Sequence, residues 1–281
     1  MKIDGKGIAQ ELLVDLTKKV AAFKAKGITP QLVIVLVGDD PASKAYVRQK
    51  ELKGTEIGAK VTIMHFDDIT QEKLLEVVKE LNEDKNVHGI IIQQPLPTTI
   101  DIPTITQAVD PRKDVDSFHK ESSYPMPLAA GVLRILESVY QTKTAQVEST
   151  FQDWLGGQTI VVIGKGETGG GPVIKALLAM HVTPKVVDSK TANPEELTKS
   201  ADIIITAVGK TGVVNPSTIK KGVVLISVGL HKGEDGKLHG DYNEGEIADI
   251  ASAYTPTPGG VGPVNVAMLL QNLLDATELL C

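Results

Sequence analysis

Tyr46 and Lys50 are the first side chains in the sequence whose types and spacing could do chemistry. They lie four residues apart in the segment 39–50, which follows an apolar run and is predicted to be helical, so both would occupy one helical face. A phenol ring can stack on a flat substrate, and a neighbouring lysine can move protons. Because lysines are mostly exposed, the pair taken alone fits a solvated helix face better than a site.

Two further polar segments follow predicted strands. Gln93 ends the apolar run 88–93 and Gln94 follows it, and the segment 113–116, Lys-Asp-Val-Asp, lies in the next connection. Open α/β sheets bind ligands at the carboxyl ends of their strands, so an amide and carboxylates in these places favour a functional site. The alternatives are a proline-bounded strand exit and a solvated acidic turn.

A glycine-rich loop follows the apolar run 159–163 and precedes a helical pattern at 173–180. Gly164, Gly166 and Gly169 satisfy the GxGxxG pattern, and Lys165 and Gly170 lie in the same loop. Without side chains, the glycines would let a pyrophosphate approach the backbone amides at a positive helix N-terminus. The loop therefore predicts nucleotide binding, and the alternative is a glycine-rich turn without a ligand.

The residues after the next strand leave the choice of nucleotide open. Asp188 lies 24 positions after Gly164, where a carboxylate commonly accepts hydrogen bonds from the adenosine ribose, which favours NAD. Lys165 and Ser189 could instead contact a 2′-phosphate, which favours NADP. A carboxylate that only caps a turn is the ordinary alternative for Asp188.

The segment 255–263 has three prolines and three glycines in nine residues and precedes an apolar helical run at 264–280. Proline restricts the backbone, and glycine lets backbone amides approach a ligand closely. This composition predicts a stiff loop that binds a ligand, although a tight turn between two elements has the same residues.

The pattern along the chain predicts an α/β fold with two parallel sheets. Short runs rich in valine and isoleucine alternate with amphipathic segments, as in βαβ units whose sheets are covered on both faces. We expect Asn193 and Thr70 to cap two of the helices. The predicted strands are 31–38, 60–66, 88–93, 159–164, 185–189, 202–209 and 223–229.

The polar stretch 140–150 separates the two groups of strands, and we place the domain boundary there. The expected domains are 1–140, completed by a C-terminal segment 262–281 that returns to it, and 141–261, a Rossmann-type dinucleotide-binding domain.

Composition excludes several classes of protein. The 281 residues are 42% hydrophobic with a net charge of -6 and no basic cluster longer than a pair, so neither nucleic acid nor a membrane surface is an expected partner. No apolar run approaches the ~20 residues of a membrane span, and no signal core follows Met1. The one cysteine, Cys281, excludes an internal disulfide and a cysteine-based metal cluster. We therefore expect a cytoplasmic protein without a metal.

In combination, these motifs resemble the methylenetetrahydrofolate dehydrogenase/cyclohydrolase family over nearly the whole chain. The motifs occur in the family's order and include Tyr46 and Lys50 of the predicted helix and Gln93 before Pro95-Leu96-Pro97. The other matching segments are 113–116, 240–241 and 257–263.

The resemblance implies oxidation of 5,10-methylenetetrahydrofolate to the methenyl cation with a nicotinamide cofactor, followed by hydrolysis to 10-formyltetrahydrofolate. It implies a homodimer, with Lys50, Gln93 and Asp116 as catalytic residues and Tyr46 stacked on the folate. NADP is the expected cofactor because of the resemblance and Lys165, and NAD is the alternative because of Asp188. The remaining substrate-binding residues that it implies are Pro258, Gly259, Gly260, Val261, Gly262 and Pro263.

Several residues depart from the family pattern. The segment 125–131 lacks the usual Cys-Thr pair, and Ser117 replaces a glycine. Lys165 and Asp188 stand where members often have arginine and histidine. The rival interpretations are a dehydrogenase of another small substrate on the same fold and a non-catalytic nucleotide-binding protein.

Overall fold

The computed structural model describes residues 1–143 and 149–281, which form two compact units. One unit comprises residues 10–127 and 266–281, and the other comprises residues 1–9 and 128–265. Residues 144–148 of the predicted linker lie outside the described residues, and the domain limits that we expect from the sequence stay a prediction. Within the described residues, no helix has the length and apolar character needed to cross a membrane.

The unit of residues 10–127 and 266–281 contains a three-stranded parallel sheet in the order β2-β1-β3. All three strands coincide with predicted runs, and β1 and β3 are almost wholly buried, which is why they are apolar on both faces. The strands are β1 (Gln31–Val37), β2 (Lys60–Phe66) and β3 (Gly89–Ile92).

Helices cover both faces of this sheet. One face packs on α3 and α4 through a buried aliphatic cluster that includes Val35, Leu74 and Ile105. On the other face, a Cβ atom added to Gly89 of β3 would lie 2.8 Å from Leu273 Cδ1 of α10. The helices that contribute to this unit are α1 (Gly5–Ala25), α2 (Pro41–Glu56), α3 (Gln71–Glu83), α4 (Ile102–Ala108) and α10 (Val261–Leu280).

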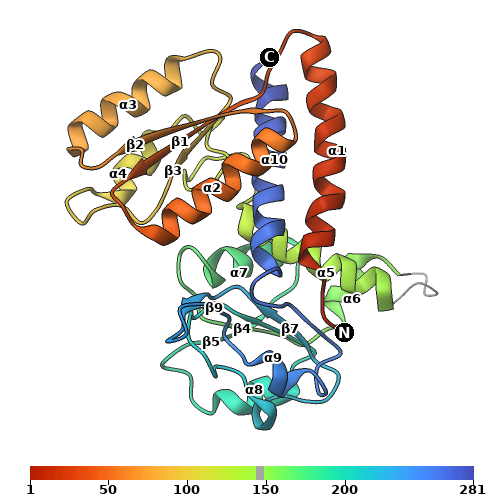
Figure 1. Cartoon of the computed structure of the whole chain (residues 1–281). Coiled ribbons are helices and arrows are strands. Elements are labelled where there is room, and N and C mark those ends of the chain that lie inside the picture. The colour runs from red at the N-terminus through yellow and green to blue at the C-terminus, as the bar shows by residue number, and fades with distance from the viewer. Residues whose placement is uncertain (144–148) are drawn as a thin grey trace. The chain divides into compact units, whose positions relative to one another are not determined.

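The C-terminal helix returns to the N-terminal sheet, as predicted. α1 and α10 lie side by side (Figure 1), and Lys19 Nζ donates to Gln271 Oε1 over 3.3 Å. Asn272 Nδ2 of α10 donates to the carbonyls of Val115 and Pro125 at 2.9 Å each, which fixes the segment between them.

The other unit contains a five-stranded parallel sheet in the order β10-β7-β6-β4-β5. The four strands predicted in this half are confirmed, but β10 was not predicted because it has only two residues. The strands are β4 (Ile160–Ile163), β5 (Lys185–Val187), β6 (Ile203–Thr206), β7 (Val224–Ser227) and β10 (Ala253–Tyr254), with an antiparallel pair β8 (His231–Lys232) and β9 (Leu238–His239).

The order of strands places a topological switch point at β4, where the chain runs first to β5 and then to β6 on the other side. Ligands of doubly wound sheets bind at the carboxyl ends of the strands at such a point. The helices and the 3₁₀ turn of this unit are α5 (Pro127–Lys143), α6 (Phe151–Gly156), α7 (Gly170–Ala179), α8 (Pro194–Ser200), α9 (Glu244–Ile247) and η1 (Pro216–Thr218).

The two predicted helix caps differ in outcome. Thr70 caps α3, and its side chain accepts from Lys73 N. Asn193 occupies the N-cap position of α8 but makes no side-chain cap hydrogen bond. Its backbone is left-handed, with φ 50°, whereas capping side chains ordinarily accompany an extended backbone.

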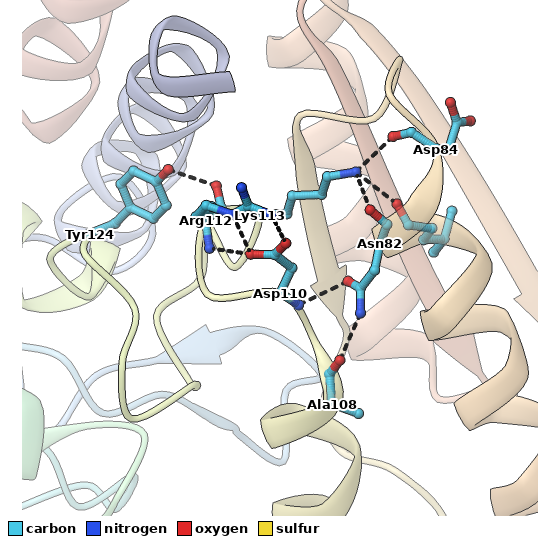
Figure 2. Close-up of polar contacts among 8 residues, drawn as sticks. Asn82, Asp84, Ala108, Asp110, Arg112, Lys113 and Tyr124 are labelled. Atoms are coloured by element: carbon cyan, nitrogen blue, oxygen red, sulfur yellow. Dashed lines mark hydrogen bonds and ion pairs between the residues drawn. The ribbon is translucent and has the colours of Figure 1, made fainter. Parts of the chain in front are cut away.

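Lys113 is a buried lysine that fixes the loop leading to Asp116. Its Nζ donates to the carbonyls of Leu81 at 3.0 Å, Asn82 at 2.8 Å and Asp84 at 2.7 Å (Figure 2). These groups lie at the C-terminus of α3, where carbonyls lack helical partners and a positive charge is favourable. Burial lowers the pKa of Lys113. The ammonium group therefore joins the loop to the end of the helix.

A second set of hydrogen bonds holds the same loop (Figure 2). Asn82 donates from Nδ2 to Ala108 O and accepts from Asp110 N, both over 2.8 Å. Tyr124 Oη donates to Arg112 O over 2.7 Å. Backbone groups of the residues just before Lys113 are thus tied to neighbouring elements.

We predict that Lys113→Met lowers the free energy of unfolding by about 3 kcal/mol, because it leaves three carbonyls without their charged donor. Urea unfolding measures the change, with Lys85→Met as the control because Lys85 is exposed close to the same helix end. Equal effects of the two substitutions would contradict this role of Lys113.

His88 makes the stability of this unit depend on pH. Its Nδ1 accepts from Gln31 N over 3.1 Å, which requires a lone pair on that nitrogen, and burial lowers the pKa of His88. The unfolded chain therefore binds a proton near pH 6.5 that the folded chain does not, so stability is lost as the pH falls through that range.

We expect His88→Asn to reduce the loss of stability between pH 7.5 and pH 5, because an amide oxygen can accept from Gln31 N without titrating. Urea midpoints at the two pH values give the comparison. The same substitution at the exposed His181 should leave the pH dependence as in the parent protein. A pH dependence unchanged by His88→Asn would refute the assignment.

Candidate functional site

Lys50 is buried, with a relative exposure of 2%, in the unit that contains β1 to β3. Its Nζ donates to Gln93 Oε1 over 3.2 Å and lies 3.6 Å from Asp116 Oδ2. The same nitrogen lies 4.8 Å from the centroid of the Tyr46 ring. The structure thus brings together four residues that the sequence singled out from three separate segments. We call them the Lys50 cluster.

The start of α2 determines where Lys50 points. Asp40 caps the helix by accepting from Ser43 N at 2.7 Å and Ser43 Oγ at 2.8 Å, and Pro41 follows at the first helical position. The helix buries Ser43, Val47, Lys50 and Gly54, which recur at helical spacing. Lys50 is therefore on the face of α2 that packs inward, and not on a solvated face.

Gln93 is held in one orientation. Its backbone N–H donates to Val35 O over 2.9 Å, which places it directly after β3. Its Nε2 donates to Gln94 O over 2.6 Å, so the amide oxygen is left to accept from Lys50.

The two aspartates of the segment 113–116 have different surroundings. Asp114 is buried and accepts from His119 N at 2.6 Å and Ser117 N at 3.1 Å. Burial raises the pKa of Asp114 to about 6. Asp116 is partly exposed and reaches Lys50. Asp114 therefore shapes the loop, a role that the sequence pattern did not distinguish from that of Asp116.

Ser117 has a left-handed backbone, with φ 63°, at the position where the resemblance expects glycine. Its Oγ donates to Tyr124 O over 2.8 Å. A serine thus adopts the conformation that glycine adopts most easily, and its hydroxyl group adds a contact that glycine lacks.

The Lys50 cluster can bind and orient a polar, flat molecule. Asp116 offers carboxylate oxygens, and Lys50 offers N–H groups beside a ring face. Burial raises the pKa of the Tyr46 phenol, so it stays neutral. A buried ammonium next to one carboxylate and one amide oxygen can also orient a water molecule for attack.

The glycine loop after β4 fits a dinucleotide. Gly164 has φ 89°, and an added Cβ would lie 2.6 Å from Ala207 O. An added Cβ on Gly170 would overlap Gly164 O, whereas none of the described atoms lies within 4 Å of one on Gly166. Gly164 therefore makes the turn, Gly166 leaves its backbone open to a pyrophosphate, and Gly170 allows close packing at the start of α7. Gly169 precedes the helix as its N-cap.

Lys165 and Asp188 contact each other. Lys165 Nζ lies 2.7 Å from Asp188 Oδ2. Asp188 Oδ1 also accepts from Lys190 N at 2.9 Å and from Thr191 Oγ1 at 3.1 Å. The hydrogen bond from Lys165 and these further donors lower the pKa of Asp188 to about 2. The two residues that favoured different nucleotides thus form one ion pair, and Ser189 is exposed next to it.

The proline- and glycine-rich loop follows β10 in the unit of the five-stranded sheet. Gly259 has φ 103°, and an added Cβ on Gly260 would lie 2.6 Å from Pro256 O. α10 begins at Val261, so the predicted helix start at residue 264 was three residues late. Val261, Gly262 and Pro263 form its first turn, where proline is tolerated. The predicted binding role of residues Pro258 to Pro263 stays a prediction.

Comparison with known proteins agrees with this geometry. The chain matches the tetrahydrofolate dehydrogenase/cyclohydrolase catalytic domain over residues 3–116 and the NAD(P)-binding domain of the same family over residues 141–280. It is 40% identical over 280 residues to the bifunctional protein FolD of Streptococcus agalactiae, covering 98% of this chain and 96% of the relative. The FolD protein of Acidovorax sp. is 39% identical over 282 residues, with 98% of each chain covered.

Solved structures give the same result. The bifunctional FolD enzyme of Campylobacter jejuni superposes with a TM-score of 0.91 at 34% identity, covering 99% of this chain and 98% of that one. The FolD enzyme of Trypanosoma brucei, solved with NADP cofactor and inhibitor, has a TM-score of 0.86 at 31% identity, covering 99% and 97%. The resemblance found in the sequence is confirmed: the chain belongs to the tetrahydrofolate dehydrogenase/cyclohydrolase family.

Proposed function

We propose that the Lys50 cluster is the folate-binding and hydrolytic centre of this enzyme. As a family member, the chain is a bifunctional enzyme that oxidises 5,10-methylenetetrahydrofolate and hydrolyses the methenyl product to 10-formyltetrahydrofolate. The observation that supports the proposed centre is the burial of Lys50 Nζ against Gln93 Oε1, 3.6 Å from Asp116 Oδ2.

Asp116 would bind the pterin ring. A pterin presents a ring N–H and an exocyclic amino group side by side, and one carboxylate can accept from both. Asp116 is partly exposed, and its distance to Lys50 exceeds a hydrogen bond, so it retains acceptor capacity. Tyr46, a neutral phenol, would stack on the folate.

Lys50 would act in the hydrolysis. Water adds to the methenyl carbon, one carbon–nitrogen bond breaks, and a proton is released as the formyl group forms. Lys50 Nζ would orient the attacking water, and Gln93 keeps that nitrogen in place through its oriented amide.

The dehydrogenase step needs no acid or base from the protein. The lone pair of a substrate nitrogen expels the hydride, so the protein contributes mainly alignment. NADP, when bound, accepts this hydride. The open backbone at Gly166 and the start of α7 would hold the pyrophosphate, and Asp188, Ser189 and Lys165 would face the adenosine ribose.

NADP is the cofactor that we propose, with NAD as the alternative. The Trypanosoma brucei relative was solved with NADP, and the Lys165 ammonium is a phosphate-binding group. We further propose that residues Pro258 to Pro263 contact substrate, and that the functional domains are 1–140 with 262–281 and 141–261.

We also propose a cytoplasmic homodimer that binds neither nucleic acid nor membrane. The homodimer is proposed from the family resemblance. The net charge of -6, without a basic cluster, argues against a nucleic-acid partner.

We predict that Lys50→Met lowers the rate of methenyltetrahydrofolate hydrolysis at least about 100-fold, because the group that orients water is lost. Absorbance of the methenyl group measures the rate, and calorimetry should show unchanged NADP affinity. Lys53→Met is the matched control, since Lys53 lies on the same helix and pairs with Glu56 near the surface. Hydrolysis at the parent rate would exclude Lys50 as the catalytic residue.

Asp116→Asn should raise the KM for methylenetetrahydrofolate roughly 10- to 100-fold, because the amide replaces one of the two acceptor oxygens by an NH2 donor that faces a donor of the pterin. Initial rates of cofactor reduction at varied folate concentration give the value. Glu121→Gln, an exposed change on the same loop, should leave KM unaltered. An unaltered KM in Asp116→Asn would favour a dehydrogenase of another substrate.

A further inference from the structure

The Lys165–Asp188 ion pair lies where a Rossmann domain recognises the adenosine ribose. Asp188 directly follows β5, which neighbours β4 in the sheet, and Lys165 belongs to the glycine loop after β4. A carboxylate in this place accepts from the 2′-hydroxyl of NAD, and a cation binds the 2′-phosphate of NADP. Here both groups are present, and each is the partner of the other.

The hydrogen bonds of Asp188 leave room for one more donor. Oδ1 accepts from Lys190 N and Thr191 Oγ1, while Lys165 Nζ is the one donor to Oδ2 among the described residues. A carboxylate has about four lone-pair positions. A ribose 2′-hydroxyl can therefore donate to Oδ2 while the ion pair stays intact, so NAD fits without rearrangement.

A 2′-phosphate meets opposing effects at the same place. It has no hydroxyl donor for Asp188, and its negative charge is repelled by the ionised carboxylate of Asp188. Lys165 attracts the phosphate, but its ammonium must then be shared with Asp188. The Lys165 side chain is 64% exposed, so giving up part of this pair reduces affinity only about fivefold or less. NADP is thus accepted without being strongly preferred.

We propose that Asp188 is a specificity-determining residue which, by pairing with Lys165, makes this enzyme bind NAD and NADP with similar affinity. The proposal rests on the dinucleotide site of the proposed function. Lys165 alone would favour NADP, and Asp188 offsets this preference. The two residues therefore have opposite effects on the ratio of the dissociation constants for NADP and NAD.

Calorimetric titration of the full chain with NADP and NAD tests the proposal without relying on turnover. In the parent protein we expect the two dissociation constants to agree within about tenfold. Asp188→Asn keeps the acceptor for Lys190 N and removes the charge. The affinity for NADP relative to NAD should therefore rise about tenfold. In Lys165→Met, the affinity for NADP relative to NAD should fall about tenfold.

Three controls keep the outcomes separate. Adenosine 2′,5′-bisphosphate and 5′-AMP should repeat the shifts, because they contain the ribose end alone. Lys185→Met, an exposed change at the start of β5, should leave the ratio as it is. Thermal unfolding of Asp188→Asn and a second variant, Asp188→Ser, checks that each protein is folded.

Three results would overturn the proposal. A parent protein that binds one of the two nucleotides clearly more than about tenfold tighter than the other, or an Asp188→Asn protein with an unchanged ratio of dissociation constants, shows that Asp188 does not set specificity while the dinucleotide site itself stands. Binding of neither nucleotide to the parent protein shows that the site is wrongly assigned, and both proposals then fail.

Discussion

A buried ammonium group is costly unless charged and polar partners surround it, and Lys50 imposes this constraint on its whole unit. The chain meets it from three elements: α2 places Lys50, the end of β3 supplies Gln93, and the loop after α4 supplies Asp116. Removing any of these partners would leave a buried charge without compensation. The elements that determine their positions are therefore as important to the site as the partners themselves.

Those elements are fixed by further buried polar contacts. The capping by Asp40 defines where α2 begins, and the Lys113 ammonium ties the loop of Asp116 to the end of α3. Two buried lysines therefore have different tasks in one unit. The Lys113 ammonium donates to three backbone carbonyls, whereas Lys50 faces side chains and an aromatic ring, which leaves it suited to contact a ligand.

The sequence predicted the architecture because its strongest signals are local. Seven apolar runs became strands, and the order of strand, glycine loop and helix identified the dinucleotide-binding half. β10 was not predicted because a strand of two residues is too short to show a hydrophobic pattern. The β8–β9 hairpin was not predicted either, although the dipeptide Asp235-Gly236 is typical of a hairpin turn. Gly236 has φ 75° in the structure.

Contacts between distant residues were less predictable. Helical spacing predicts that Tyr46 and Lys50 are neighbours, and the strand-end positions of Gln93 and the segment 113–116 indicate a functional site. Only the resemblance implied that Gln93 and Asp116 form one catalytic group with Lys50. Nothing in the segment 113–116 showed that Lys113 would cap a helix thirty residues earlier. The sequence indicates Lys165 and Asp188 as rival recognition groups for the adenosine ribose, but it does not show that the sheet brings their loops together and pairs them.

The most direct test of the central claim follows reduced cofactor and methenyl absorbance together as the purified protein reacts with 5,10-methylenetetrahydrofolate and NADP. The account predicts that reduced cofactor forms while methenyl product is consumed by hydrolysis. Absence of cofactor reduction, or methenyl product that accumulates without hydrolysis, would contradict it.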